Sequence, residues 1–163
     1  MTLDKFEKAS KIIKEAYPYI NPENNQYTGA YKVRGAYYKI STLTDDERKR
    51  GLITASAGNH AQGVAYAAKR YGCDATIVMP TTTPLIKVNR TKSYGANVVL
   101  SGDVYDEAEA KALEIAEEKG LTFIHPFNDT DVATGQGTIA MEIFKEQPLV
   151  EGMNKRKSFF LGN

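Results

Sequence analysis

Two segments of the chain combine residue types that could act on amines and on anions. In residues 28–36 (TGAYKVRGA), Lys32 follows Gly29, which permits an unusual turn, and stands near the expected start of a helix. Residues 56–63 (SAGNHAQG) form a short polar loop between an apolar strand and an alanine-rich helix. A lysine amine forms imines with carbonyl groups, and a helix start binds anions. Together these are two main parts of a cofactor site that handles amino compounds.

The surroundings expected for Lys32 would favour its uncharged, nucleophilic form. The positive end of the helix dipole and the neighbouring Arg34 should both disfavour the protonated amine. An uncharged amine is what an imine-forming lysine needs. The alternative is a solvated surface lysine, which is the usual state of this residue type. Tyr31 could be a core residue or a flat face beside an aromatic ring.

The loop at residues 56–59 suits a carboxylate or a phosphate. The first backbone N–H groups of the following helix have no partner within that helix, and the helix dipole adds partial positive charge. Gly58 lets an anion approach the backbone closely. The alternative is an ordinary turn in which Ser56 or Asn59 caps the helix. The spelling of the loop alone does not choose between the two.

The other notable residues have structural interpretations. Gly135 and Gly137 interrupt an expected helix, where each costs roughly 1 kcal/mol relative to alanine, and close packing against another element would explain them. His60 and His125 are the only histidines, are far apart, and lack carboxylates at useful spacing. Cys73 is the only cysteine. We therefore expect no metal site and no catalytic triad.

Apolar strands alternate with helices along most of the chain. This order predicts an α/β fold of three layers, a four-stranded parallel sheet with helices on both faces and right-handed crossovers. Such sheets bind ligands at the carboxyl ends of their strands, where residues 56–59 lie. Thr44 and Glu47 have the spacing of a capping box. The expected strands are 52–55, 75–79, 97–100 and 121–124, and the expected helices are 2–16, 32–43, 60–71, 84–94, 104–119 and 130–145.

Composition and charge argue against several classes of partner. Of the 163 residues, 42% are hydrophobic and 25% are charged, as in a single globular domain. A net charge of +1 gives no reason to expect a nucleic-acid partner. No apolar run approaches a membrane span, and residues 1–14 lack the apolar core of a signal peptide. These features favour a cytoplasmic protein without membrane contact.

The motifs together resemble the fold-type II enzymes that use pyridoxal 5′-phosphate (PLP), and above all the threonine dehydratases, also called threonine ammonia-lyases. Residues 22–26 (PENNQ), 31–36 (YKVRGA) and 56–63 match that family's lead-in, lysine segment and substrate loop. The resemblance covers residues 21–148. Shorter motifs occur in the family's order at residues 79–80 (MP), 94–96 (YGA), 125–127 (HPF) and 135–138 (GQGT).

The resemblance implies a role for each residue of the two segments. Lys32 would be the Schiff-base lysine, with Tyr31 also in contact with the cofactor, and Asn59 would hydrogen-bond the 3′-oxygen of PLP. The implied fold is the smaller domain of these enzymes. The residues that would bind the substrate carboxylate are Ser56, Ala57, Gly58, Asn59 and His60.

The implied reaction is the deamination of L-threonine to 2-oxobutanoate and ammonia, or of L-serine to pyruvate and ammonia. Related serine racemases carry a serine in place of Ala57, and that serine supplies a second acid–base group. Because alanine cannot transfer a proton, the resemblance favours elimination over racemisation. The implied setting is amino-acid metabolism, with isoleucine biosynthesis and threonine catabolism as the two alternatives.

The chain departs from the family's pattern at both ends. Residues 1–20 are expected to form an N-terminal helix and a shortened lead-in, residues 21–148 the smaller domain, and residues 149–163 an atypical tail that is either frayed or a small docking segment. The glycine-rich loop that would hold the PLP phosphate does not follow residue 150. We therefore expect a truncated enzyme. The alternative is an inactive or partner-dependent fragment, a non-catalytic interaction module that binds a complementing chain or forms a homo-oligomer.

Overall fold

The computed structural model describes residues 2–16, 23 and 26–146. The sequence expectations for the break near residue 17, for most of the lead-in at residues 22–26 and for the tail at residues 149–163 lie outside these residues. In the part of the chain that is described, no helix is long and apolar enough to cross a lipid bilayer.

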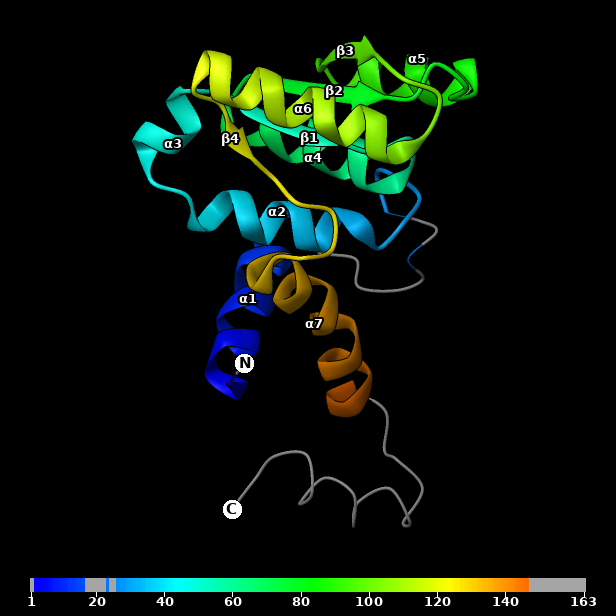
Figure 1. The fold of residues 1–163 in the computed structure, drawn as a ribbon. Coiled ribbons are helices and arrows are strands. Elements are labelled where there is room, and N and C mark those ends of the chain that lie inside the picture. Colours follow the sequence, from blue (N-terminus) through cyan, green and yellow to red (C-terminus); the bar gives the residue numbers. More distant parts are fainter. Residues whose placement is uncertain (1, 17–22, 24–25, 147–163) are drawn as a thin grey trace.

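A four-stranded, all-parallel sheet forms the centre of the fold (Figure 1). Its strands lie in the order β3-β2-β1-β4, so that β1 and β2 are central and largely buried. Central strands of a parallel sheet are covered on both faces, which explains why β1 and β2 are mostly apolar. The bounds are β1 Leu52–Ala55, β2 Ala75–Met79, β3 Asn97–Leu100 and β4 Thr122–Phe123.

β4 is shorter than the strand expected at residues 121–124. Only two residue pairs join it to β1. The Ile124 N–H still donates to the Ile53 carbonyl oxygen at 2.8 Å. Pro126 follows two residues later and has no N–H with which to extend the ladder. The early end of β4 leaves residues 124–129 as a loop at the carboxyl edge of the sheet, which we call the His125 loop.

The part of the chain that the structure describes contains seven helices (Figure 1). Their bounds are α1 Leu3–Ala16, α2 Lys32–Thr42, α3 Asp45–Lys49, α4 Asn59–Tyr71, α5 Leu85–Ser93, α6 Tyr105–Lys119 and α7 Thr130–Glu146. α6 covers one face of the sheet, and α4 and α5 cover the other. The three-layer prediction is therefore confirmed. Beyond α4 lies α2, and α1 and α7 pack against α2.

Alternation along the strands explains the two apolar cores. In β1, Ile53 and Ala55 face α6, whereas Leu52 belongs to the core under α4. Successive strand residues point to opposite faces, so a single apolar strand contributes to both cores. On the α6 side, the buried partners are Ala108, Ala112 and Ile115.

The predicted capping box is confirmed at the start of α3. The Glu47 N–H donates to Thr44 Oγ1 at 3.2 Å, and the Thr44 N–H donates to Glu47 Oε2 at 2.7 Å. Two backbone donors that a helix start leaves unpaired are thereby satisfied. This short surface helix connects α2 to β1.

A buried ion cluster joins α1, α2 and α7. The Arg34 side chain of α2 is 1% exposed, and its guanidinium donates to Glu142 of α7 at 2.8 Å and to Glu23 at 2.7 Å. Thr138 accepts a further bond from the guanidinium, and Ser10 of α1 donates to the second oxygen of Glu142. Charges removed from water are tolerated when they are paired and hydrogen-bonded in this way.

Candidate active site

Lys32 is the first residue of α2, and its amine points to the carboxyl edge of the sheet. Nζ donates to the Pro126 carbonyl oxygen of the His125 loop at 3.3 Å and lies 5.8 Å from the centre of the Tyr31 ring. Tyr31 is 43% exposed, so it is a flat surface beside the amine and not a core residue. No described carboxylate forms an ion pair with Lys32.

The charge of Arg34 does not stand alone beside Lys32. We expected its charge to disfavour protonation of the Lys32 amine. Arg34 is instead paired with Glu23 and Glu142, which bring two negative charges to its one positive charge. The pairing carboxylate on α7 is 108 residues away in the sequence, so no local pattern could have indicated it.

The backbone around Lys32 is fixed by close helix packing. A Cβ on Gly63 of α4 would lie 3.1 Å from the Lys32 carbonyl oxygen, and a Cβ on Gly135 of α7 would lie 2.7 Å from the Arg34 carbonyl oxygen. Gln136 of α7 donates to the Lys32 carbonyl oxygen at 3.4 Å and accepts from the Gly35 N–H at 3.3 Å. The interpretation of Gly135 as a site of close packing is confirmed. For Gly137 the same holds, since a Cβ there would meet the Phe6 ring.

The start of α4 keeps its backbone donors available. The helix begins at Asn59, with Gly58 at the N-cap, and no side chain caps it. Ser56 Oγ instead accepts from the Gly58 N–H at 3.2 Å. The alternative interpretation, in which Ser56 or Asn59 caps the helix, is therefore wrong. A Cβ on Gly58 would meet nothing within 4 Å, and Asn59 is exposed with no hydrogen bond from its side chain to another described residue.

His60 ties this helix start to the His125 loop. Its ring is 3% exposed, and Nε2 lies 3.4 Å from the Ile124 carbonyl oxygen. A carbonyl can only accept, so this contact requires the proton on Nε2 and leaves Nδ1 bare. Nδ1 has no described partner. Burial lowers the pKa of His60 to about 4, and the charge of Lys32 acts in the same direction. His60 is therefore neutral near pH 7.

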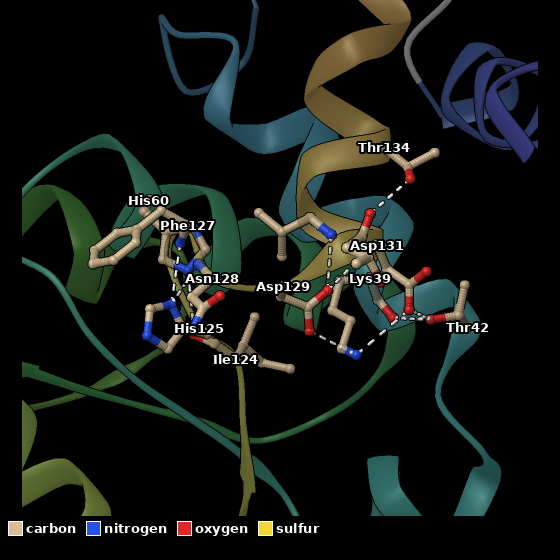
Figure 2. A network of polar contacts seen from close by, with 12 residues as sticks. Lys39, Thr42, His60, Ile124, His125, Phe127, Asn128, Asp129, Asp131 and Thr134 are labelled. Carbon is tan, nitrogen blue, oxygen red and sulfur yellow. Dashed lines mark hydrogen bonds and ion pairs between the residues drawn. The ribbon is translucent and has the colours of Figure 1, made fainter. Parts of the chain in front are cut away.

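Figure 2 shows how the His125 loop is held between the sheet and α7. His125 Nδ1 accepts from the backbone N–H groups of Phe127 and Asn128. Asp129 accepts from two N–H groups in the first turn of α7 and forms an ion pair with Lys39 of α2 at 2.8 Å. The loop is thus attached to α2, α4 and α7 at once.

The structure brings the predicted site residues to one place. Lys32 contacts the His125 loop directly, and the loop of Ser56, Ala57, Gly58 and Asn59 is joined to it through His60. Sequence reasoning missed that His60 and His125 meet at the same loop. The available signal was that residues 125–127 directly follow a strand. No group of three or more metal-binding side chains occurs among the described residues.

The sequence matches one protein family over residues 3–158, described as pyridoxal-phosphate dependent enzyme. It is 55% identical over 133 residues to an L-threonine ammonia-lyase of Thermotoga maritima, a match that spans 82% of this chain and 33% of that protein. A catabolic L-threonine dehydratase of Staphylococcus aureus is 50% identical over 137 residues, which are 84% of this chain and 40% of the relative. The chain thus spans well under half the length of these curated relatives.

Solved structures agree in fold. A threonine deaminase isoform 2 of Solanum lycopersicum superposes with a TM-score of 0.78 at 40% identity, over 91% of this chain and 50% of the other. A second threonine deaminase, from T.th., gives a TM-score of 0.80 at 34% identity, over 90% and 52% of the two chains. A serine racemase of Dictyostelium discoideum gives 0.83 at 29% identity, over 93% and 55%.

Proposed function

The chain belongs to the pyridoxal-phosphate dependent enzymes, and we propose that it forms the lysine-bearing part of an L-threonine ammonia-lyase. The observation that carries the proposal is the position of Lys32. Its amine lies at the ligand-binding edge of a parallel sheet and has only a carbonyl oxygen as its described hydrogen-bond partner. No described observation favours the alternative of a non-catalytic interaction module.

The described residues fit the amine-facing side of PLP. Lys32 supplies a primary amine without a described carboxylate partner, and Asn59 presents an exposed amide close to the start of α4. The open space beside Gly58 leaves room for a ligand at that helix start. Contacts to the PLP phosphate would come from other parts of the whole protein, because the relatives are more than twice as long as the match.

When bound, PLP would withdraw electrons from Cα of the amino acid and so make its proton easier to remove. Lys32 Nζ is the group that would hold the cofactor and then take the Cα proton. The Pro126 carbonyl oxygen, which accepts from Nζ here, would orient the amine. The uncapped N–H groups of α4 would bind the substrate carboxylate, since they carry partial positive charge.

The loop residues Ser56, Ala57, Gly58, Asn59 and His60 divide these tasks. Ser56 shapes the turn by accepting from the Gly58 N–H. Asn59 would reach the 3′-oxygen of PLP, and Tyr31 would lie against the cofactor near Lys32. Ala57 carries no group that could return a proton to the opposite face of Cα, so we propose elimination from L-threonine or L-serine over racemisation.

We further propose that a second segment or subunit completes the site. Leu85 and Ile86 at the start of α5 are 72% and 76% exposed, and Phe127 in the His125 loop is 66% exposed. Large apolar side chains so exposed are typical of surfaces that another protein segment covers. The partner would be a complementing chain or another copy in a homo-oligomer.

The proposed setting is isoleucine biosynthesis in the cytoplasm. Expression of the chain, alone and together with the remaining part of the Thermotoga maritima relative, in an isoleucine auxotroph that lacks threonine dehydratase tests this setting. Growth without isoleucine is the expected result for the complemented pair. If a strain shows measurable threonine deamination and still fails to grow without isoleucine, that result would argue against this pathway.

The direct test of the activity is the release of 2-oxobutanoate from L-threonine by the full chain with saturating PLP. The chain is assayed alone and mixed with the remaining part of the Thermotoga maritima relative. We expect activity at least in the mixture and its loss in the Lys32→Ala variant. Absence of 2-oxobutanoate in both arms, or equal activity in the variant, would contradict the proposal.

A further inference from the structure

We propose that His125 is a positioning residue that holds Lys32 in place through the backbone of the His125 loop. This inference rests on the proposed function of Lys32 and adds a residue that controls it. His125 does not touch the amine. It acts through the loop, whose Pro126 carbonyl oxygen accepts from Lys32 Nζ at 3.3 Å. Figure 2 shows the ring turned toward the backbone of the residues that follow it.

The hydrogen bonds of His125 fix its tautomer. Nδ1 lies 3.2 Å from the Phe127 nitrogen and 2.8 Å from the Asn128 nitrogen. Both nitrogens are backbone N–H groups and can only donate, so Nδ1 must be the bare, accepting nitrogen. The proton of the neutral ring is therefore on Nε2. One ring atom thus accepts hydrogen bonds from the N–H groups of the two residues that directly follow Pro126.

The other face of the ring is held by α6 and by aromatic side chains. Glu109 of α6 lies 3.6 Å from Nε2, so the Nε2–H of the neutral ring faces this carboxylate. Burial raises the pKa of Tyr105, and its hydroxyl donates to the same Glu109 oxygen. Phe123 and Phe127 stand edge-on to the imidazole at ring-centre distances of 6.1 and 4.6 Å. These contacts leave the ring little freedom to turn.

The chain of contacts then runs from the sheet face to the amine. Glu109 and the aromatic rings orient His125, and His125 fixes the backbone at Phe127 and Asn128 by accepting their N–H groups. The closed loop presents the Pro126 carbonyl oxygen to Lys32. Pro126 is a buried residue, so the loop that presents this carbonyl oxygen is packed against the rest of the fold.

Two substitutions separate this role from simple packing. In His125→Asn, Oδ1 stands two bonds from Cβ, as Nδ1 does, and can accept the same two N–H groups. In His125→Gln, the acceptor stands three bonds from Cβ, as Nε2 does, so it no longer lies at the position of Nδ1. Gln is the larger of the two and fills more of the site. A packing role therefore predicts that Gln is tolerated better, whereas the positioning role predicts that Asn is.

The full chain is studied by NMR and by competitive chemical labelling. In the wild type, the nitrogen spectrum of His125 should show a bare Nδ1 and a protonated Nε2. Amide exchange at Phe127 and Asn128 should be about tenfold faster in His125→Gln and within about threefold of wild type in His125→Asn. Acetylation of Lys32 relative to exposed Lys119 should change several-fold in the Gln variant only.

Two results would overturn the inference. One is a protonated Nδ1 in the wild type, and the other is equal amide exchange and equal Lys32 labelling in the two variants. None of these readouts involves PLP or threonine. If the chain fails to deaminate threonine, NMR still decides the role of His125. If the NMR results contradict that role, the lyase proposal is unaffected.

Discussion

Lys32 and Arg34 are cations two positions apart on α2, yet their surroundings are opposite. Arg34 is 1% exposed and forms ion pairs with Glu23 and Glu142, so its charge is neutralised inside the protein. Lys32 is half-buried at the edge of the sheet, and a carbonyl oxygen is its only described hydrogen-bond partner. One helix thus carries a structural cation on the side toward α7 and a candidate catalytic cation at its start.

The difference shows how function can be distinguished from stability in such a site. A buried cation whose N–H groups are directed at two carboxylates is not available to bind a ligand. An amine that meets only a carbonyl group can exchange that partner for a ligand at small cost. The number and kind of hydrogen-bond and ion-pair partners, and not the residue type, distinguish the structural cation from the candidate catalytic one.

Removing the buried cation should have the largest effect on stability. Arg34→Ala leaves Glu142, which is 1% exposed, without its opposite charge, and we expect a loss of about 3–5 kcal/mol in the free energy of unfolding. Lys32→Ala is the matched control on the same helix and should cost less than about 1 kcal/mol. Urea denaturation of both variants measures this. Equal losses would break the comparison between the two cations.

Acid should destabilise the site through His60. Its pKa of about 4 in the folded chain lies below the ordinary 6.5, so the unfolded state binds the proton more readily between these pH values. Stability contributed by the neutral ring is complete above pH 6.5 and falls as the pH drops toward 4, by about 3 kcal/mol. Urea denaturation at pH 7 and pH 4 checks this.

The matched control for this prediction is His60→Gln, which does not titrate. The loss of stability between pH 7 and pH 4 should be about 3 kcal/mol smaller in the variant than in wild type. All other ionisable groups are common to the two proteins, so their contributions cancel in this difference. An identical pH dependence of the two proteins would show that His60 is not held neutral.

Two glycines extend the comparison from side chains to backbone. Gly135→Ala would place a Cβ 2.7 Å from the Arg34 carbonyl oxygen, and we expect a loss of about 1–3 kcal/mol from overpacking. Gly58→Ala meets nothing within 4 Å and should leave stability within about 0.5 kcal/mol. Thermal unfolding ranks the two. A larger loss of stability in Gly58→Ala than in Gly135→Ala would contradict the assignment of Gly58 to open space and of Gly135 to close packing.

The capping box at α3 should give the smallest effect and serves as a distant reference. Thr44→Ala removes the acceptor for the Glu47 N–H and should cost about 1 kcal/mol. Covalent attachment of PLP to Lys32 should not change, because the cap lies on a surface helix away from the carboxyl edge near β1. A fall in PLP attachment in this variant would indicate that the site responds to general loss of stability.

The sequence predicted most of the fold because its signals are local. Alternating apolar strands and helices gave all four strands, and the spacing of Thr44 and Glu47 gave the cap. The exceptions are element ends: α4 begins one residue earlier, at Asn59, and β4 ends early, before Pro126. Such ends depend on tertiary contacts that no local pattern records.

The site was predictable only in its parts. Lys32 and the loop from Ser56 to His60 stood out by residue type, spacing and resemblance. The partners of Arg34 and the meeting of His60 with the His125 loop could not be read from the sequence. The Arg34–Glu142 pair spans 108 residues and the contact of His60 with Ile124 spans 64, and they form where α7 packs on α2 and where β4 pairs with β1.

The central claim is that Lys32, and not another cation, is the amine that handles the cofactor. The most direct measurement is a titration of the full chain with PLP, followed by borohydride reduction and peptide mass spectrometry, in wild type and in Lys32→Ala. The account predicts a stable pyridoxyl group on the Lys32 peptide that is absent from the variant. No such group, or equal labelling of other lysines in both proteins, would contradict it.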